Sequence, residues 1–374
     1  MKILIMAESF GYGPIITALN VATELKKLND VYLDFIGKGT ALEQAKMSNY
    51  FDSFIVCDLN DDNDLIKYEE SFKVYDAILS SDTLNGTIFL IKKSYKNVYY
   101  IDNLMWMWDE IPEELCNVKK YIVSETIPSE YNFERIGKQI KNPMFVGPIR
   151  NIKTKVSCNV DDRKMIINIG GTESFLLDPQ TILTFYNKLI NYILLNNKVK
   201  QLDKIIVCGG SNVINNIILE EENKNVIIKT LSNEDYLSEM ESSKFCVMAS
   251  GLGNFIETIG LNKNIMYLPA INYSQLQQIE YYESQNFGFN IINWSDFEYF
   301  NEIPKYLDEA TGVKLVTENI EKFNKGNYKK LVDYKINEYF MNNQDEFFNI
   351  RTEYTLKLDK NASKKIAKEI YNSK

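Results

Sequence analysis

The sequence predicts an α/β protein built from two Rossmann-like, doubly wound domains that face a central cleft. Two observations lead to this prediction. Strand-like apolar runs alternate with helix-like segments along most of the 374 residues, and repeated βα units imply a parallel sheet covered by helices. The alternation is interrupted once, by Gly147-Pro148 and the polar stretch that follows them, and a chain of this length is comfortable for two domains.

The interruption sets the expected domain boundaries. We expect an N-terminal Rossmann-like domain over 1–149, a linker over 150–163 and a C-terminal Rossmann-like domain over 164–360. The last segment, 361–374, is expected to be a helix that packs back on the N-terminal domain.

The first half opens with a strand at Lys2–Ala7, a helix at Pro14–Lys27 with apolar residues at helical spacing, and a strand at Val31–Ile36. Further strands are expected at Phe54–Cys57, Ala77–Leu79, Val98–Ile101, Tyr121–Val123 and Met144–Val146. The acidic segment from Cys57 to Glu70 is expected to be a solvated loop.

The second half repeats the pattern, and three of its strands end in glycine-containing turns. Strands are expected at Lys164–Ile169, Lys204–Cys208, Val226–Lys229, Phe245–Ser250 and Asn264–Leu268, and helices at Thr181–Leu195, Asn233–Ser242 and from Ile320 onward. The turns are Gly170-Gly171-Thr172, Gly209-Gly210-Ser211 and Gly251-Leu252-Gly253-Asn254. We therefore expect several glycine turns on one rim of the second sheet.

Composition narrows the classes of partner. A net charge of −9 and a pI near 5.0 argue against a nucleic-acid partner. No apolar stretch is long enough to cross a bilayer, and the N-terminal run does not read as a signal peptide, so a cytoplasmic protein is expected. Five widely spaced cysteines indicate neither a disulfide framework nor a zinc site. The sequence does not fix the oligomeric state, and a homodimer is compatible with it.

The chain contains no histidine. This excludes a histidine general base, a Ser-His-Asp triad and a histidine-ligated metal. Because no Asp-x-Asp lies at a strand end suited to chelating a diphosphate, we expect neither a metal nor another cofactor.

Candidate catalytic residues lie in the first half. Glu8 places a carboxylate at the end of the first strand, before a turn that contains Tyr12 and Gly13. Two interpretations of this loop remain open: a catalytic or acceptor-binding role, or a purely structural turn. Asp102 ends another strand and is a second candidate base, and Asp82 is a third.

An aromatic segment follows Asp102. Asn103, Trp106 and Trp108 lie in it, and such a cluster usually belongs to a core. After a strand that faces a cleft, however, the tryptophans are placed to stack on a planar or sugar acceptor.

Candidate binding residues in the second half cluster after the strand Phe245–Ser250. The turn Ser250, Gly251, Leu252, Gly253 and Asn254 opens a helix, where backbone amides bind a phosphate-sized group. Glu257 follows about one helical turn later, and Gln277 and Gln278 offer amides for several hydroxyls. The Thr172 hydroxyl is expected to face the same cleft.

These motifs resemble the GT-B glycosyltransferases, in particular the MurG and UDP-glycosyltransferase branch. The resemblance implies that Ser250–Asn254 receive the donor diphosphate, that Glu257 holds the ribose and that Gln277 and Gln278 touch the donor sugar. It also implies a uracil-type base near Thr230, Leu231 and Ser232. The domain over 1–149 is then expected to be the acceptor domain and the domain over 164–360 the nucleotide-sugar domain.

One departure from the family concerns the base. The family's first-strand loop commonly contains a histidine, and here Tyr12 and Pro14 occupy that neighbourhood. Either Glu8 or Asp102 replaces it, or the acceptor needs little deprotonation.

A shorter stretch is similar to proteins related to cytosylglucuronate synthase, which glycosylate a nucleobase nitrogen. The similarity covers the segments around Gly11–Ile15 and Asp102–Trp108. It implies a flat acceptor against a tryptophan.

The resulting expectation is an inverting, metal-independent glycosyltransferase, similar to hexosyltransferases, that moves a sugar from a UDP-sugar to a small acceptor. The acceptor would contact Tyr12, Gly13, Asn103, Trp106 and Trp108. A UDP-sugar hydrolase and a catalytically degenerate nucleotide-sugar-binding subunit are the alternatives.

Overall fold

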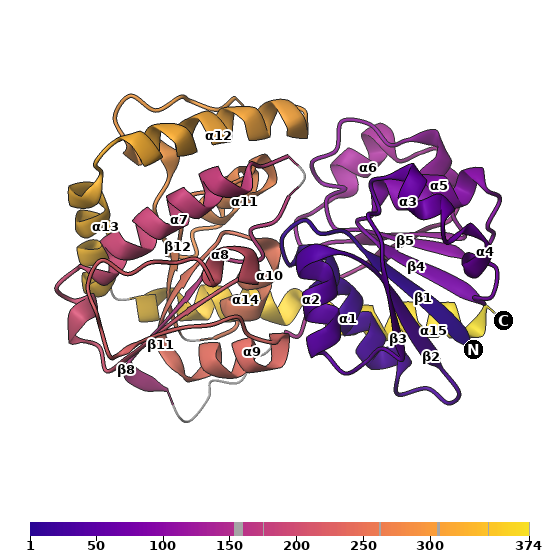
Figure 1. Ribbon diagram of the computed structural model, residues 1–374, viewed down its shortest axis with the longest axis horizontal. Helices are drawn as coiled ribbons and strands as arrows, with labels where there is room; N and C mark the ends of the chain where they lie inside the picture. The colour runs from indigo at the N-terminus through magenta and orange to yellow at the C-terminus, as the bar shows by residue number, and fades with distance from the viewer. Residues whose placement is uncertain (153–159, 175, 262, 305–306, 343, 374) are drawn as a thin grey trace. The chain divides into compact units, whose positions relative to one another are not determined.

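The computed structural model describes the chain except residues 153–159, 175, 262, 305–306, 343 and 374 (Figure 1). The chain forms two compact units, each with its own parallel sheet. The first unit comprises Met1–Asn151 and Leu358–Lys374, and the second comprises Ile152–Lys357.

The first unit contains a 7-stranded sheet in the order β3-β2-β1-β4-β5-β6-β7, with every neighbouring pair parallel. Its strands are β1 (Lys2–Ala7), β2 (Tyr32–Gly37), β3 (Ser53–Val56), β4 (Ala77–Ser81), β5 (Val98–Asp102), β6 (Lys120–Ser124) and β7 (Pro143–Val146). Strand order runs outward in both directions from the β1–β4 pair, which is the doubly wound arrangement.

Alternating side chains of β1 enter two separate cores, one on each face of the sheet. Ile3 and Ile5 belong to the core covered by α1 (Gly13–Leu25), α2 (Gly39–Met47) and α15 (Ala362–Asn372). Leu4 and Met6 belong to the core covered by α3 (Asp62–Ile66), α4 (Glu69–Phe72), α5 (Leu84–Lys92) and η1 (Glu113–Asn117), and α6 (Glu130–Ile136) packs against its margin. The last helix, α15, lies beside α1 (Figure 1), so the C-terminal segment completes the first core.

The second unit contains a 6-stranded parallel sheet in the order β10-β9-β8-β11-β12-β13. Its strands are β8 (Asp161–Asn168), β9 (Lys204–Cys208), β10 (Val226–Ile228), β11 (Ser243–Met248), β12 (Asn264–Tyr267) and β13 (Asn290–Ile291). The order again runs outward in both directions, here from the β8–β11 pair.

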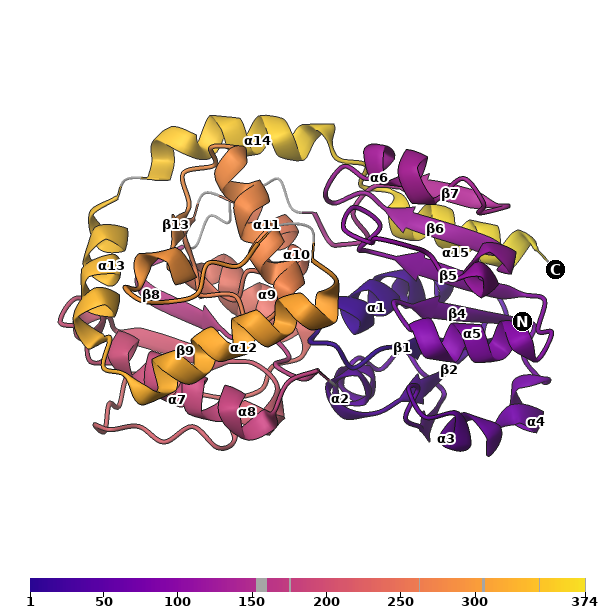
Figure 2. The same cartoon turned by 90° about the horizontal axis from the view of Figure 1, so that it is seen from above.

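Helices surround the second sheet. They are α7 (Pro179–Leu194), α8 (Ser211–Ile214), α9 (Asn233–Ser242), α10 (Leu252–Ile259), α11 (Tyr273–Ser284), α12 (Glu309–Lys325), α13 (Lys329–Met341) and α14 (Phe348–Lys357), with short turns η2 (Val199–Gln201), η3 (Trp294–Asp296) and η4 (Gln344–Phe347). Figure 2 shows α12 packed along α7.

The predicted α/β class with two doubly wound sheets is confirmed, and three local expectations differ from the structure. The acidic segment 57–70 contains α3 and α4 instead of a continuous loop, because the Asp61 side chain caps α3 by accepting from the Asn63 amide. Helix α12 begins at Glu309, well before Ile320, where Asp308 accepts from the Thr311 amide. Of the expected linker, Asp161–Arg163 belong to β8, and 153–159 lie outside the described residues.

In the part of the chain that the structure describes, no helix combines the length and apolar character that crossing a bilayer requires. Cys57, Cys116, Cys208 and Cys246 are buried free thiols, whereas Cys158 lies outside the described residues. Within the same residues, no cluster of acidic, cysteine or histidine side chains is arranged to hold a metal ion.

Candidate functional site

The topology of each sheet marks one position for a ligand. Doubly wound sheets bind ligands outside the carboxyl ends of their strands, where the strand order reverses. In the first unit, Glu8 follows β1 and Asp82 follows β4 at this position. In the second unit, the corresponding turns are the one with Gly170 after β8 and the one with Ser250 after β11.

The turn after β11 leaves backbone amides open to a ligand. Gly251 caps α10 in an extended conformation, and the first amides of a helix have no partner within the helix. A Cβ added to Gly251 would meet nothing within 4 Å, so the backbone can be approached closely. The N-terminus of α10 therefore has the properties of an anion-binding site.

The side chain of Asn254 holds this turn in place. Its Nδ2 donates to the Ala249 carbonyl at 2.8 Å, and its Oδ1 accepts from Tyr236 Oη at 2.8 Å and from Asn168 Nδ2 at 3.0 Å. Asn168 Oδ1 in turn accepts from the Gly170 amide at 2.9 Å. Both polar atoms of the Asn254 side chain therefore hydrogen-bond to the protein, and the backbone N–H of Asn254 remains available to a ligand.

Asn168 and Tyr236, which complete this network, were not predicted as site residues from the sequence. The role of Asn168 could have been predicted, because Asn168 is a polar residue at the end of a strand whose preceding residues are apolar. The role of Tyr236 could not, since a buried tyrosine on an amphipathic helix usually belongs to the hydrophobic core.

Other predicted donor residues line the same edge of the second unit. Glu257 is 4% exposed on α10, and Leu231 is buried after β10. Gln278 is 4% exposed on α11, while Gln277 is partly exposed. Tyr282 Oη donates to the Ser250 carbonyl at 3.2 Å, so α11 is tied to the turn that opens α10.

Several buried polar atoms at this edge lack a protein partner. Ser250 Oγ, Gln278 Oε1 and Thr230 Oγ1 are buried and make no hydrogen bond within the described part of the chain. Buried polar groups are usually hydrogen-bonded, so each such atom needs an explanation. Ser250 directly precedes α10, Gln278 lies in the second turn of α11 and Thr230 follows β10. These positions fit a site that is completed by a polar ligand.

The remaining glycine turns have a structural explanation. The Gly210 amide donates to the Gly170 carbonyl at 2.9 Å, and a Cβ at Gly210 would lie 2.3 Å from the Gly171 carbonyl oxygen. Thr172 has a left-handed backbone, with φ of 58°, and its hydroxyl contacts the Gly171 carbonyl and Asn212 Oδ1. These residues let the turns after β8 and β9 pack closely.

Glu8 in the first unit is a buried carboxyl with one unused oxygen. It is 7% exposed, and Oε1 accepts from the Ser9 amide at 3.1 Å and from Asn60 Nδ2 at 2.9 Å. Within residues 1–151, no hydrogen bond is made to Oε2. Burial raises the pKa of Glu8 above its ordinary value, and Asp58 adds to this, while Asn60, Ser9 and Lys38 oppose it.

Asp102 is fully buried, and the protein uses both of its oxygens. Oδ1 accepts from the Leu104 amide at 2.7 Å and from Trp108 Nε1 at 3.0 Å, and Oδ2 accepts from Tyr121 Oη at 2.7 Å. Burial raises its pKa, and these donors oppose the rise. The hydrogen bonds anchor the tryptophan segment to the sheet, which favours a supporting role for Asp102.

The other predicted acceptor residues gather near Asp82. Asn103 donates its backbone amide and its side-chain Nδ2 to the Asp82 carboxylate, and Trp106 Nε1 donates to the Asn103 carbonyl at 3.1 Å. Burial raises the pKa of Asp82 to about 7, with a further rise from Asp102 and opposition from Asn103 and Arg150. Tyr12 and Gly13 lie where α1 begins.

Arg150 connects this group to the start of α1. Its guanidinium donates to the Gly13 carbonyl and to Thr17 Oγ1. Gly13, Thr17, Asn103 and Asp82 therefore form one hydrogen-bonded group at the carboxyl edge of the first sheet.

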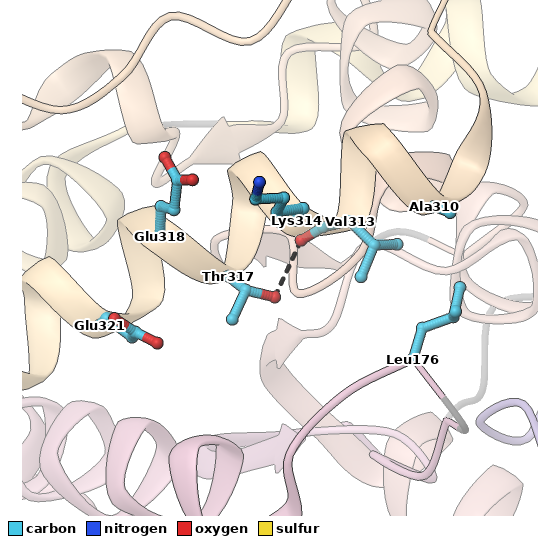
Figure 3. Close-up of a pocket in the computed structure, with 7 residues that line it drawn as sticks. All are labelled: Leu176, Ala310, Val313, Lys314, Thr317, Glu318 and Glu321. Carbon is cyan, nitrogen blue, oxygen red and sulfur yellow. Dashed lines mark hydrogen bonds between the residues drawn. The ribbon is translucent and has the colours of Figure 1, made fainter.

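The second unit also has a groove on α12, with a volume of about 410 Å³ (Figure 3). Leu176, Ala310, Val313, Lys314, Thr317, Glu318 and Glu321 line it. None of the predicted site residues lies in this groove.

Comparisons with known proteins identify the fold. No protein-family model and no curated protein sequence matches the chain. Among solved structures, it is similar to MurG of Acinetobacter baumannii, with a TM-score of 0.51, 12% identity and 99% of each chain covered. A UDP-glucosyltransferase from Polygonum tinctorium capable of glucosylating indoxyl gives a TM-score of 0.51 at 12% identity, covering 100% of this chain and 99% of the other.

A third similar structure belongs to a different enzyme type. The UDP-GlcNAc 2-epimerase from Neisseria meningitidis, bound to UDP-GlcNAc, gives a TM-score of 0.55 at 15% identity with both chains fully covered. At these identities the matches establish the fold, which is the GT-B fold predicted from the sequence.

Proposed function

We propose that the protein is a glycosyltransferase that moves a sugar from a UDP-sugar to a small-molecule acceptor. The observation that carries this proposal is the turn Ser250–Asn254. It lies at the strand-order reversal of a GT-B sheet, has open backbone at Gly251 and is fixed by the Asn168–Asn254–Tyr236 network. A preorganised helix N-terminus of this kind suits a diphosphate.

The donor would bind along the edge of the second sheet. The α10 amides would receive the diphosphate, and Glu257 would accept hydrogen bonds from the ribose. Gln277 and Gln278, on the helix tied to the same turn, would contact the sugar, with the base near Leu231. The polar atoms of Ser250 and Gln278 that lack protein partners support this placement.

Glu8 would act as the general base. Its unused oxygen, its position at the end of β1 and its raised pKa suit a group that takes a proton from the acceptor. The acceptor's X–H bond would break with the proton passing to Glu8. As X bonds to the anomeric carbon, the bond from that carbon to the diphosphate oxygen would break, and the electron pair would leave with UDP, inverting the configuration.

The leaving diphosphate would be stabilised by the α10 amides. Fixed dipoles aimed at developing charge perform the task that a divalent cation performs in other enzymes. We therefore propose a metal-independent reaction.

The acceptor would bind the first unit beside the tryptophans. Trp106 and Trp108 are partly exposed and are held by hydrogen bonds to Asn103 and Asp102. A ring held in this way suits stacking on a flat molecule, so a small heterocycle resembling a nucleobase is the proposed acceptor.

The base assignment is tested by Glu8→Gln and Asp102→Asn, with UDP release from a UDP-sugar panel as the measurement. Glu8→Gln should lower turnover by about a hundred- to ten-thousand-fold, the usual contribution of a general base, with UDP affinity almost intact. Near wild-type turnover in Glu8→Gln together with loss in folded Asp102→Asn would move the role to Asp102. Activity in both variants would contradict carboxylate catalysis by either residue.

A second candidate is an enzyme that acts on the UDP-sugar without a separate acceptor, such as a hydrolase. The match to a UDP-GlcNAc 2-epimerase favours keeping this candidate. Product analysis separates the possibilities: glycosylated acceptor supports the transferase, and free sugar supports the hydrolase. Donor affinity without turnover supports the degenerate binding subunit.

A further inference from the structure

The loop after β3 reaches the Glu8 carboxyl through one side chain. Asn60 lies in this loop, and its Nδ2 donates to Glu8 Oε1 at 2.9 Å. The two residues are 52 positions apart in the chain. Strand β2 lies between the strands that precede them, because the sheet order there is β3-β2-β1. Both residues belong to the first unit, so the contact depends on the fold of that unit alone.

Neighbouring residues hold Asn60 beside Glu8. The Asn60 backbone amide donates to Asp58 Oδ1 at 3.0 Å, and Asp58 Oδ2 forms an ion pair with Lys38 Nζ at 2.5 Å. The Asp58 backbone amide donates to Asp64 Oδ2 at 2.7 Å. Lys38 directly follows β2, and its carbonyl accepts from the Ser9 hydroxyl. Hydrogen bonds and an ion pair therefore join the loops after β1, β2 and β3.

The hydrogen bond from Asn60 makes the two oxygens of Glu8 different. Oε1 accepts from Asn60 and, at 3.1 Å, from the Ser9 backbone amide, whereas within residues 1–151 no hydrogen bond is made to Oε2. A proton added to Oε1 would compete with two N–H donors for its lone pairs. A proton added to Oε2 would leave both hydrogen bonds in place. The contacts therefore favour Oε2 as the oxygen that takes a proton.

Other groups around Glu8 also affect its charge. The titratable and charged side chains that lie around it, from the neighbouring strands and loops, are Lys38, Asp58, Asp82, Tyr100 and Asp102. Burial raises the pKa of Glu8, and Asp58 adds to the rise. Among the groups that oppose the rise, Asn60 has the largest effect. The reason is that an N–H donor stabilises a carboxylate more than it stabilises the neutral acid.

We propose that Asn60 is the positioning residue for Glu8, because its amide holds Oε1 and leaves Oε2 as the oxygen that takes the acceptor's proton. This inference rests on the proposed role of Glu8 as general base and specifies how the base is held. The acceptor's X–H bond breaks and its proton passes to Oε2. The hydrogen bonds from Asn60 and Ser9 stay on Oε1, so the carboxyl group keeps its orientation during the transfer.

A pH titration of Glu8 by NMR tests this role in the full chain, with carbon-13 in the glutamate side-chain carboxyl groups and no substrate present. The Glu8 signal is the one that Glu8→Gln lacks. Asn60→Ala should move the midpoint of this signal to higher pH, because the variant lacks the donor that favours the ionised form. Asn60→Asp should move the midpoint further in the same direction, because a negative charge then replaces the donor.

A second signal distinguishes positioning from a general structural effect. In the wild type, the side-chain amide protons of Asn60 should respond to pH with the same midpoint as the Glu8 carboxyl. In Glu8→Gln they should lose this response. Both signals come from the contact itself, and a change that only loosened the loop would not make them titrate together.

Two matched variants control for loop structure and for charge. Asn85 donates to the Leu59 carbonyl of the same loop at 3.2 Å, so Asn85→Ala weakens the loop without removing the donor to Glu8. It should keep the wild-type midpoint. Asn63 is exposed on α3, and Asn63→Asp adds one negative charge nearby, so it should move the midpoint less than Asn60→Asp does.

Three outcomes would overturn the inference. They are an unchanged Glu8 midpoint in folded Asn60→Ala, an equal shift in Asn85→Ala, and Asn60 amide protons that do not follow the Glu8 titration. None of these measurements requires UDP or an acceptor. Failure of UDP to bind would contradict the proposed function and leave the Asn60–Glu8 contact unaffected, so the two failures are distinguishable.

Discussion

At the residue scale, Glu309 shows how strongly a local environment can change a carboxyl group. It lies in the first turn of α12, and both of its carboxyl oxygens are buried. Burial raises its pKa to about 7, the Ser274 amide opposes the rise, and Asp308 adds to it. The neutral form therefore fits the folded protein better than the charged form.

This environment predicts a pH-dependent stability. Because the folded pKa lies above the ordinary 4.5, the stabilising effect of the neutral form is present below pH 4.5 and is lost as the pH rises through about 7. Glu309→Gln remains neutral, so thermal unfolding should show it more stable than wild type at pH 8, by at most about 3.5 kcal/mol at about 1.4 kcal/mol per pKa unit. At pH 4 the two should be similar.

Glu321→Gln is the matched control, since Glu321 lies on the same helix in a solvent-exposed ion pair with Lys325. It should leave the pH profile unchanged. Parallel stability profiles for Glu309→Gln and wild type between pH 5 and 8 would refute a raised pKa at Glu309.

Glu8 and Asp102 also illustrate what the sequence could and could not indicate. Both were recognisable as carboxylates at strand ends. Their difference depends on partners outside the strands that carry them, since Tyr121 and Trp108 donate to both oxygens of Asp102, whereas Asn60 donates to only one oxygen of Glu8. Strand periodicity contains no information on such pairings.

At the element scale, the turn that opens α10 depends on side chains from three segments. Asn254 receives hydrogen bonds from Tyr236 on α9 and from Asn168 at the end of β8. Removing Asn254 would leave the nearly buried Tyr236 hydroxyl without this acceptor. The geometry of the helix N-terminus should therefore depend on this one amide.

Asn254→Ala should destabilise the second unit by about 1 to 3 kcal/mol, the cost of unsatisfied buried polar groups, and should also weaken UDP binding. Tyr236→Phe removes only one donor, and Asn168 still contacts Asn254, so its effect should be smaller. Chemical denaturation and calorimetric UDP titration measure both effects. Unchanged UDP affinity in folded Asn254→Ala would show that the network does not shape the site.

Most strands were predictable, whereas helix starts were less so. Buried parallel strands such as Lys2–Ala7 and Lys204–Cys208 are continuous apolar runs and agree with the prediction at both ends. Helix α12 begins earlier than predicted. Its first turns, which follow the Asp308 cap, include Gly312, and glycine disfavours a helix interior. That glycine is required by packing, since a Cβ there would lie 2.2 Å from the Tyr273 ring.

At the scale of the whole molecule, the two units share the same sheet topology. Each has a parallel sheet whose order reverses beside its first strand, and each places its candidate residues at that reversal. The second unit presents helix amides there, and the first presents carboxylates and aromatic rings. This arrangement is compatible with the proposed donor site on the second unit and the proposed acceptor site on the first.

The turn residues of the site were predictable, but the division of roles among them was not. The glycines after β8, β9 and β11 look equivalent in sequence. Only the structure shows that Gly210 packs against the β8 turn while Gly251 faces open space. This distinction depends on the distance between two turns, which a local motif does not encode.

The central claim is a metal-independent UDP site on the second unit, and calorimetric titration of UDP in the presence of EDTA tests it most directly. Wild type should bind UDP without a divalent cation, and Glu257→Ala should weaken binding by about 1.5 to 3 kcal/mol, the range for hydrogen bonds to a charged group. Glu283→Ala, at the far end of α11, should bind like wild type. Absence of binding, binding that requires magnesium or manganese, or unchanged affinity in folded Glu257→Ala would contradict the claim.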